Sequence, residues 1–239
     1  SGLIVYNLAY LILKSSIEYN LESNKLGAYK TNKTGGFTNV YRPSSQEDEV
    51  YVIVLGESTS RSHMGLYDYS RSTTPKLNSL EDDLIVYNDV ISPHAHSIAS
   101  ITKLLTLGNY EYPEKIGDGS IIQLANKVDF ETVWLSNQRP IGIYESLITK
   151  IALSSNKSKF LTTTYGVHNK VKDVELLPEL DAVLSEGSSS KKFIVIHLTG
   201  THFNYKNRYP DTFNIFKDTP FTNYPSDENF KIINDYDNA

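Results

Sequence analysis

The sequence predicts an α/β fold with a largely parallel central sheet and helices on both of its faces. Short runs of β-branched and other apolar residues recur along the chain, and helix-like stretches separate them. This alternation is typical of βαβ units, whose strands lie parallel. The chain has 239 residues, of which 39% are hydrophobic and 21% charged, and this composition indicates a globular protein rather than a disordered or fibrous one.

Four apolar runs predict strands. The first, at residues 50–56, is a continuous β-branched run of the kind that forms a strand buried on both faces. The other expected strands are at 84–90, 130–136 and 193–198, and the expected helices are at 74–81, 97–107, 120–128, 142–153 and 174–185.

The N-terminal part has a different character. Residues 3–13 form an apolar run that is shorter than the ~20 residues needed to span a bilayer, and no basic segment of a signal peptide precedes it. It is either a helix packed on the domain or a membrane-proximal helix that follows lost spanning segments. Residues 22–48 have few large apolar groups and predict an extended linker.

Charge and cysteine content exclude some functions. The net charge of -5, from 23 basic and 28 acidic residues, argues against a nucleic-acid partner. The chain has no cysteine, which excludes thiol catalysis, disulfides and thiolate zinc sites.

Ligands of parallel sheets bind beyond the carboxyl ends of the strands, so residues that follow the strands are candidates for chemistry. Glu57 follows the first strand after a glycine and is either a metal ligand or a carboxylate at a helix N-terminus. Arg61 and Arg71 either bind a phosphate in a bidentate manner or are solvated.

Ser97 begins a predicted helix and is either its N-cap or a nucleophile whose target phosphate lies on free backbone N–H groups. His94 and His96 lie two residues apart, as a ligand or acid–base pair would, although such a pair in a loop is a weak signal. His197 lies within a strand and fits a core residue. His202 follows that strand and is the better candidate for substrate contact.

These pieces together resemble a known family. The segments VIVLGESTSR at 52–61 and MGLYDYSRSTTP at 64–75 are similar to the opening of the phosphoethanolamine transferases of Gram-negative bacteria, although Asp68 stands where glycine is usual. These enzymes belong to the sulfatase and alkaline-phosphatase-like superfamily. Collinear matches follow at WLSNQ (134–138), HLTGTH (197–202), Tyr205 with Arg208-Tyr209-Pro210, and NDYDNA (234–239).

The resemblance implies an alkaline-phosphatase-like, three-layer α/β/α sandwich with residues 48–239 as a periplasmic catalytic domain. Residues 1–47 would be a membrane-proximal helix and linker of an inner-membrane protein. Such enzymes transfer phosphoethanolamine from phosphatidylethanolamine to lipopolysaccharide (lipid A or core) or a glycan, through a covalent enzyme intermediate. The alternatives are a phosphoglycerol transferase, a phosphatase or sulfatase-type hydrolase of the same superfamily, or a non-catalytic domain that binds a lipid headgroup or a glycan.

The resemblance also implies roles for individual residues. Glu57 matches a ligand of Zn²⁺, and Ser97 matches the nucleophile that also contacts the metal, where the family commonly has threonine. Ser100 and Thr102 remain alternatives for this nucleophile. His202 matches a catalytic histidine near the phosphate; the role of His197 stays open.

Three further residues are expected to bind substrate. Asn137 lies in a segment that lines the substrate site in the family. His96 and Arg61 are candidates for contact with the phosphate oxygens.

Two features depart from the family pattern. The family completes its zinc site with an Asp-His pair that follows the segment at 234–239, and this sequence contains no Asp-His dipeptide. We therefore expect a truncated portion with weak metal binding and little turnover, because a zinc site needs more than two protein ligands. The absence of cysteine favours the branch that modifies the lipopolysaccharide core or glycans.

Overall fold

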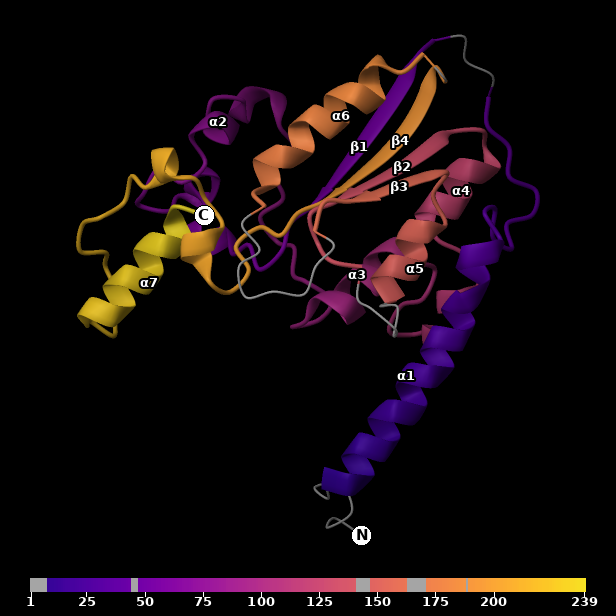
Figure 1. The fold of residues 1–239 in the computed structure, drawn as a ribbon, viewed down its shortest axis with the longest axis horizontal. Helices are drawn as coiled ribbons and strands as arrows, with labels where there is room; N and C mark the ends of the chain where they lie inside the picture. Colours follow the sequence, from indigo (N-terminus) through magenta and orange to yellow (C-terminus); the bar gives the residue numbers. More distant parts are fainter. Residues whose placement is uncertain (1–7, 44–46, 141–146, 163–170, 188) are drawn as a thin grey trace.

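The computed structural model describes residues 8–43, 47–140, 147–162, 171–187 and 189–239, with the backbone alone for residues 22–30. Its centre is a four-stranded sheet in which every neighbouring pair is parallel (Figure 1). The strand order is β1-β4-β2-β3, with β1 at Glu49–Leu55, β2 at Glu131–Ser136, β3 at Lys157–Phe160 and β4 at Lys191–His197. The predicted α/β fold with a parallel sheet is confirmed.

Helices cover both faces of the sheet. Side chains of β2 and β4 alternate between the faces, as the period of two in a strand requires. Trp134 and Val195 belong to a core with α3 (Ser97–Leu105), α4 (Ile121–Lys127) and α5 (Leu147–Leu153). Their neighbours Val133 and Ile194 belong to a second core with α6 (Leu176–Ser185). The result is the three-layer α/β/α arrangement that the sequence predicts.

Two predictions about the strands are wrong. β1 is an edge strand whose Val50, Val52 and Val54 are 43–58% exposed, so it is not buried on both faces. Residues 84–90 form no strand, and Ile85 is 82% exposed. β3 was not predicted, because its sequence, KSKF, has no apolar run.

The helix predictions are correct in place and too long in extent. α2 spans Pro75–Asn78 and α3 stops at Leu105, while Ser120 precedes α4 as its N-cap in a capping box with Gln123. The first residues of the helix predicted at 142–153 lie outside the described residues. The structure adds α7, at Asp227–Asp237.

The N-terminal helix α1 (Leu8–Thr31) is longer than expected and includes residues 22–31 of the predicted linker. It contacts α5 and the 3₁₀ helix at Pro113–Gly117, while its N-terminal part projects from the domain (Figure 1). The prediction that this helix packs on the domain is therefore wrong for its projecting part, where Leu8 is 71% exposed. Within the described residues, no helix combines the length and apolarity needed to cross a membrane.

Candidate active site

A carboxylate and a hydroxyl meet at the carboxyl end of the sheet. Glu57 follows β1 by two residues and is 8% exposed. Ser97 is the first residue of α3, and its hydroxyl donates a hydrogen bond of 2.8 Å to Glu57 Oε1. The N-cap of α3 is His96, which makes no side-chain capping bond. The Ser97 hydroxyl is therefore engaged with Glu57 instead of capping its own helix.

The hydroxyls of the two alternative nucleophiles are engaged with other partners. Ser100 Oγ is 2.8 Å from Ser92 Oγ, and the buried Thr102 hydroxyl donates to the Ile98 carbonyl at 2.6 Å. Ser97 lies where the first N–H groups of α3 have no acceptor within the helix, which is a favourable position for an anion.

The turn that carries Glu57 is held by a loop that follows β4. Ser58 has a positive φ of 53°, a conformation that non-glycine residues rarely adopt. The Thr201 backbone N–H donates to the Glu57 carbonyl at 3.0 Å, and the Thr201 hydroxyl donates to the Ser58 carbonyl at 2.7 Å. Tyr236 on α7 donates a second bond of 2.7 Å to that Ser58 carbonyl. The position of the carboxylate thus depends on segments far along the chain.

Asp173 also holds the loop that follows β4, by hydrogen bonds to its backbone. Its carboxylate accepts the backbone N–H groups of Thr199 at 2.9 Å and Gly200 at 2.7 Å, together with the Asn137 amide at 2.8 Å.

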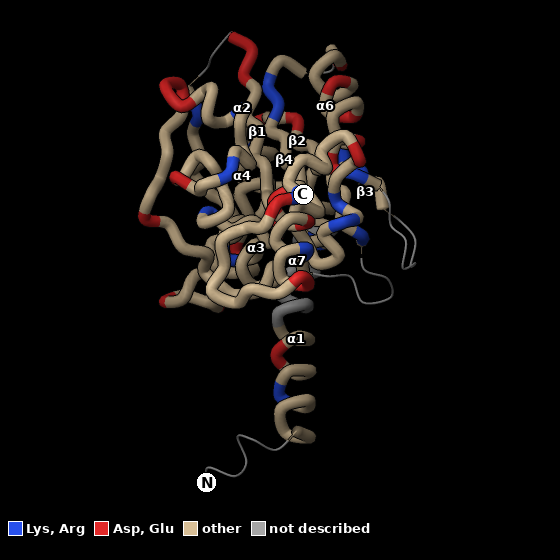
Figure 2. Tube along the Cα trace, turned by 90° about the vertical axis from the view of Figure 1, so that its left-hand side faces the viewer, with Lys and Arg blue, Asp and Glu red and all other residues tan. Residues whose placement is uncertain are grey.

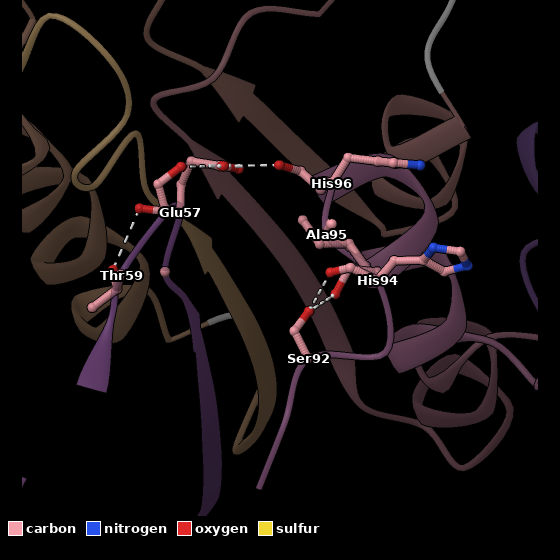
Figure 3. Close-up of a pocket in the computed structure, with 11 residues that line it drawn as sticks. Glu57, Thr59, Ser92, His94, Ala95 and His96 are labelled. Carbon is pink, nitrogen blue, oxygen red and sulfur yellow. Dashed lines mark hydrogen bonds between the residues drawn. The ribbon is translucent and has the colours of Figure 1, made fainter. Parts of the chain in front are cut away.

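Two cavities open beside the Glu57–Ser97 pair. The larger, of about 510 Å³, is lined by Glu57, Ser97 and residues of the 92–100 segment (Figure 3). The smaller, of about 140 Å³, lies next to Glu57, Ser97, Gln138, Arg139, His197 and His202. The predicted residues Glu57, Ser97 and His202 are therefore brought together around the smaller cavity.

His94 and His96 line the larger cavity, yet Figure 3 shows both rings directed away from the Glu57 carboxylate. Their ring centroids are 5.3 Å apart, and His94 stacks on Tyr110 at 5.7 Å. Both also line a third cavity, of about 420 Å³, to which Tyr19 of α1 contributes.

His197 is the last residue of β4 and is 4% exposed. Burial lowers the pKa of its imidazole to about 4, against the opposing effects of Glu57 and Asp173, so the ring is neutral at pH 7. Its Nδ1 lies 3.4 Å from Ser136 Oγ, while its Nε2 is buried and has no partner among the described residues.

Three other residues proposed for ligand binding lie outside this group. Asn137 is 1% exposed, and its amide donates to Asp173 and to the Val171 carbonyl instead of lining a described cavity. Arg61 is exposed and donates to the Asn88 carbonyl. Arg71 is neither solvated nor free for phosphate, because it pairs with Asp218 and with Asp237 at 2.8–2.9 Å.

Gln138, Arg139 and Asp173 were not predicted from the sequence. Gln138 and Arg139 follow the end of β2 by two and three residues, so the rule that singled out Glu57, position just after a strand, would also have found them. Asp173 begins a 3₁₀ helix away from any strand end, and no pattern in the sequence indicates its contact with the loop after β4.

The donors present fit only part of a zinc site. Glu57 and Ser97 offer two neighbouring oxygens, whereas protein zinc sites use three or four ligands from the chain. Throughout the described ranges, no group of three or more His, Cys, Asp or Glu side chains could hold a metal ion. These residues therefore do not form a complete zinc site by themselves.

Comparison with known proteins identifies relatives of this chain. The sulfatase family model matches residues 49–239. The chain is 30% identical over 202 residues to the phosphoethanolamine transferase EptC of Escherichia coli strain K12, covering 82% of this chain and 35% of that protein. It is also 30% identical over 203 residues to the phosphoethanolamine transferase CptA of Salmonella typhimurium, with the same coverages. The chain thus spans about a third of the length of these curated relatives.

A solved structure supports the same relation. The crystal structure of the C-terminal periplasmic domain of E. coli EptC in complex with Zn superposes with a TM-score of 0.78 at 29% identity. The match covers 84% of this chain and 57% of that one.

Proposed function

Since this chain belongs to the sulfatase family, we propose that it is part of a phosphoethanolamine transferase. Its substrates would be phosphatidylethanolamine, as donor, and a lipopolysaccharide or glycan acceptor. The names of the E. coli and Salmonella relatives support this reaction, and the relative crystallised as a periplasmic domain supports a periplasmic location. The observation that carries the proposal is the 2.8 Å hydrogen bond from Ser97 to Glu57 at the N-terminus of α3.

Ser97 is the proposed nucleophile. Its Oγ attacks the phosphorus of the donor, so an Oγ–P bond forms while the P–O bond to diacylglycerol breaks. Glu57 already accepts the Ser97 hydroxyl hydrogen and takes this proton during the attack. The departing diacylglycerol oxygen gains a proton from His202, which lines the same small cavity.

A second displacement completes the transfer. An acceptor hydroxyl attacks the phosphorus and loses its proton to His202, while the Oγ–P bond breaks and Glu57 returns its proton to the departing Ser97 oxygen. Two displacements require a nucleophilic side chain that can carry the group, and this requirement explains a hydroxyl at the first position of α3. The free N–H groups of α3 would hold the phosphate oxygens meanwhile.

Glu57 and Ser97 are the residues of this chain that would contact zinc. A bound Zn²⁺ would lower the pKa of the hydroxyl and neutralise developing negative charge. Because two ligands are too few for a tight site, we expect weak zinc binding by the described residues and reduced turnover without further ligands.

We further propose that residues 1–47 are the membrane-proximal part of the protein and that residues 48–239 are catalytic. The support is the projection of α1 from the domain and the exposure of its apolar side chains.

The test uses the matched serines of the larger cavity, Ser97 and Ser100. The protein is incubated with fluorescent phosphatidylethanolamine and zinc, and mass spectrometry locates phosphoethanolamine on its peptides. We expect the label on Ser97, at least a hundredfold less label in Ser97→Ala, and wild-type labelling in Ser100→Ala. Label on another residue, or undiminished label in Ser97→Ala, contradicts the nucleophile. Binding of the lipid without any label would support a non-catalytic domain.

A further inference from the structure

The imidazole of His197 has a buried nitrogen with no described partner. The residue is 4% exposed, and its Nε2 is the atom left unpaired, although buried polar groups are almost always hydrogen-bonded. His197 also lines the 140 Å³ cavity together with Glu57 and Ser97. An unpaired buried nitrogen next to these groups is a candidate partner for a ligand atom, which would reach it after a small shift of the ring because Nε2 itself has almost no exposed surface.

The contacts of Ser136 determine which nitrogen carries the hydrogen. Ser136 is the partner of His197 in the β2–β4 register, and it is fully buried. Its Oγ accepts the Gln138 backbone N–H at 3.0 Å and lies 3.4 Å from His197 Nδ1. If the hydroxyl donates to Nδ1, both of these atoms are satisfied and the ring hydrogen is on Nε2.

The opposite tautomer leaves two groups without partners. If Nδ1–H donated to Ser136, the hydroxyl hydrogen of Ser136 and the lone pair of His197 Nε2 would both be unpaired in the described structure. Each unpaired buried polar group is unfavourable, because it has given up its hydrogen bonds to water without replacement. The arrangement with Nε2–H leaves a single unpaired group, and that group is a donor.

We propose that Ser136 holds His197 as the Nε2–H tautomer, so that this N–H donates a hydrogen bond to an oxygen of a phosphate ester in the smaller cavity. An N–H group cannot bind a metal ion and suits an oxyanion. His197 thereby becomes a substrate-contacting residue, and Ser136 is the positioning residue that acts through it. The identity of the ester rests on the proposed function, whereas the tautomer does not.

The tautomer is measured first, on the wild-type protein without ligand. Long-range ¹H–¹⁵N spectra of protein labelled with ¹⁵N-histidine distinguish the two tautomers, and the His197 signals are those missing in His197→Gln. We expect Nε2–H in the wild type and in Ser136→Thr, which keeps the hydroxyl. Ser136→Ala should populate the Nδ1–H form. A wild-type ring with its hydrogen on Nδ1 overturns the proposal, whatever the variants do.

The ligand contact is measured next, by NMR titration with O-phosphoethanolamine. His197→Gln can place an amide N–H near the position of Nε2, whereas His197→Asn can place one only near Nδ1. We expect affinity to fall about tenfold in His197→Ala and His197→Asn and to stay within about threefold of wild type in His197→Gln. Unchanged affinity in His197→Ala overturns the contact, as does equal weakening in all three variants when thermal unfolding shows them folded.

The tautomer and titration measurements use no lipid donor, so their outcome does not depend on whether the protein is a transferase. Absence of transfer from phosphatidylethanolamine, together with binding that depends on His197, would contradict the transferase and leave this inference standing. Transfer at the wild-type rate in His197→Ala would contradict the inference alone.

Discussion

Asp237 is a buried carboxylate that ties α7 to the segment after β1. Its side chain has no exposed surface and binds His63 Nδ1 at 2.7 Å, the Tyr69 hydroxyl at 2.8 Å and Arg71 at 2.8 Å. Burial, followed by the hydrogen bond to Asp237, raises the pKa of Tyr69 to about 12. Arg71, which the sequence suggested for phosphate binding, therefore helps to hold two distant segments together.

Replacing Asp237 should destabilise the fold. Asp237→Ala leaves the Arg71 guanidinium, which is 9% exposed, without its buried partner, and we expect a loss of about 3 kcal/mol in the free energy of unfolding. Urea denaturation measures this loss. Asp218→Ala is the matched control, since Asp218 pairs with the same arginine but is 68% exposed; its loss should stay below about 1 kcal/mol. Similar losses in the two variants would show that the buried Asp237 stabilises the fold no more than the exposed Asp218 does.

His197 predicts a dependence of stability on pH. Its pKa is about 4 in the folded protein, against 6.5 as the ordinary value, because it is buried. Between these values the unfolded chain binds a proton that the folded protein does not, so stability falls as the pH decreases from about 6.5 to about 4. Over the whole window this group contributes about 3 kcal/mol.

The measurement compares urea denaturation at about pH 7 and about pH 5. The wild type should lose about 2 kcal/mol more on acidification than His197→Gln, which has no group to protonate at this site. The subtraction removes the contributions of the carboxylates and the other histidines. Equal losses in the two proteins would mean that the pKa of His197 is not lowered by burial.

At the scale of elements, the loop after β4 positions Glu57 through a glycine. Gly200 has a φ of 52°, and a Cβ at this position would lie 2.6 Å from the Glu57 carbonyl oxygen and 2.9 Å from its nitrogen. Backbone atoms cannot yield as the end of a side chain can, so Gly200→Ala should displace Glu57 and cost about 1–3 kcal/mol of stability.

The same substitution should lower the labelling of Ser97 at least tenfold, because an error of about 1 Å in a reacting group costs about a hundredfold in rate. Gly187→Ala is the control, since no atom lies within 4 Å of its Cβ position. Thermal unfolding and phosphoethanolamine labelling check both variants. Wild-type labelling in Gly200→Ala would contradict the dependence of Glu57 on this loop.

The strands show how far local sequence determines this fold. Runs of β-branched residues located β1, β2 and β4, since such side chains suit the pleated surface of a sheet. The similar run at 84–90 forms no strand, because a strand also needs a partner, and Ile85 there is exposed. The short polar strand β3 pairs with β2 although its lysines give no apolar signal; its place depends on tertiary pairing alone.

The candidate site was predictable for residues that lie just after a strand or at the start of a helix. Position alone indicated Glu57 and His202 just after strands and Ser97 at the start of a helix, and all three line one cavity. His96 could not be placed in this way, because a loop does not determine the direction of its ring (Figure 3). Asp173 and Ser136 act through hydrogen bonds between segments, and sequence spacing does not reveal such bonds.

At the scale of the whole molecule, α1 carries exposed apolar side chains and also contributes to a cavity near the candidate site. Lys14 and Glu18 are the charged positions among residues 8–21 of this helix, and Figure 2 shows this part of it largely uncharged. Tyr19 lines the third cavity together with His94 and His96, which also line the larger cavity beside Ser97. An apolar surface in contact with α1 would therefore lie close to the proposed nucleophile, as the proposed lipid donor would require.

This arrangement predicts that α1 binds the protein to lipid. Leu8 and Ile12 are 71% and 59% exposed, and insertion of such side chains into a bilayer surface contributes about 1.5–3 kcal/mol each. The double variant Leu8→Ser with Ile12→Ser should therefore reduce binding to vesicles that contain phosphatidylethanolamine at least tenfold, because about 1.4 kcal/mol corresponds to a factor of ten. Sedimentation with the vesicles measures the bound fraction. Leu177→Ser with Leu184→Ser is the matched control: both leucines are exposed, at 55% and 44%, but they lie on α6, across the sheet from α1 (Figure 1). If the α1 variant sediments like the wild type, or the α6 variant loses as much binding, the lipid contact is not made by α1, and the proposed orientation of the site toward the membrane fails with it.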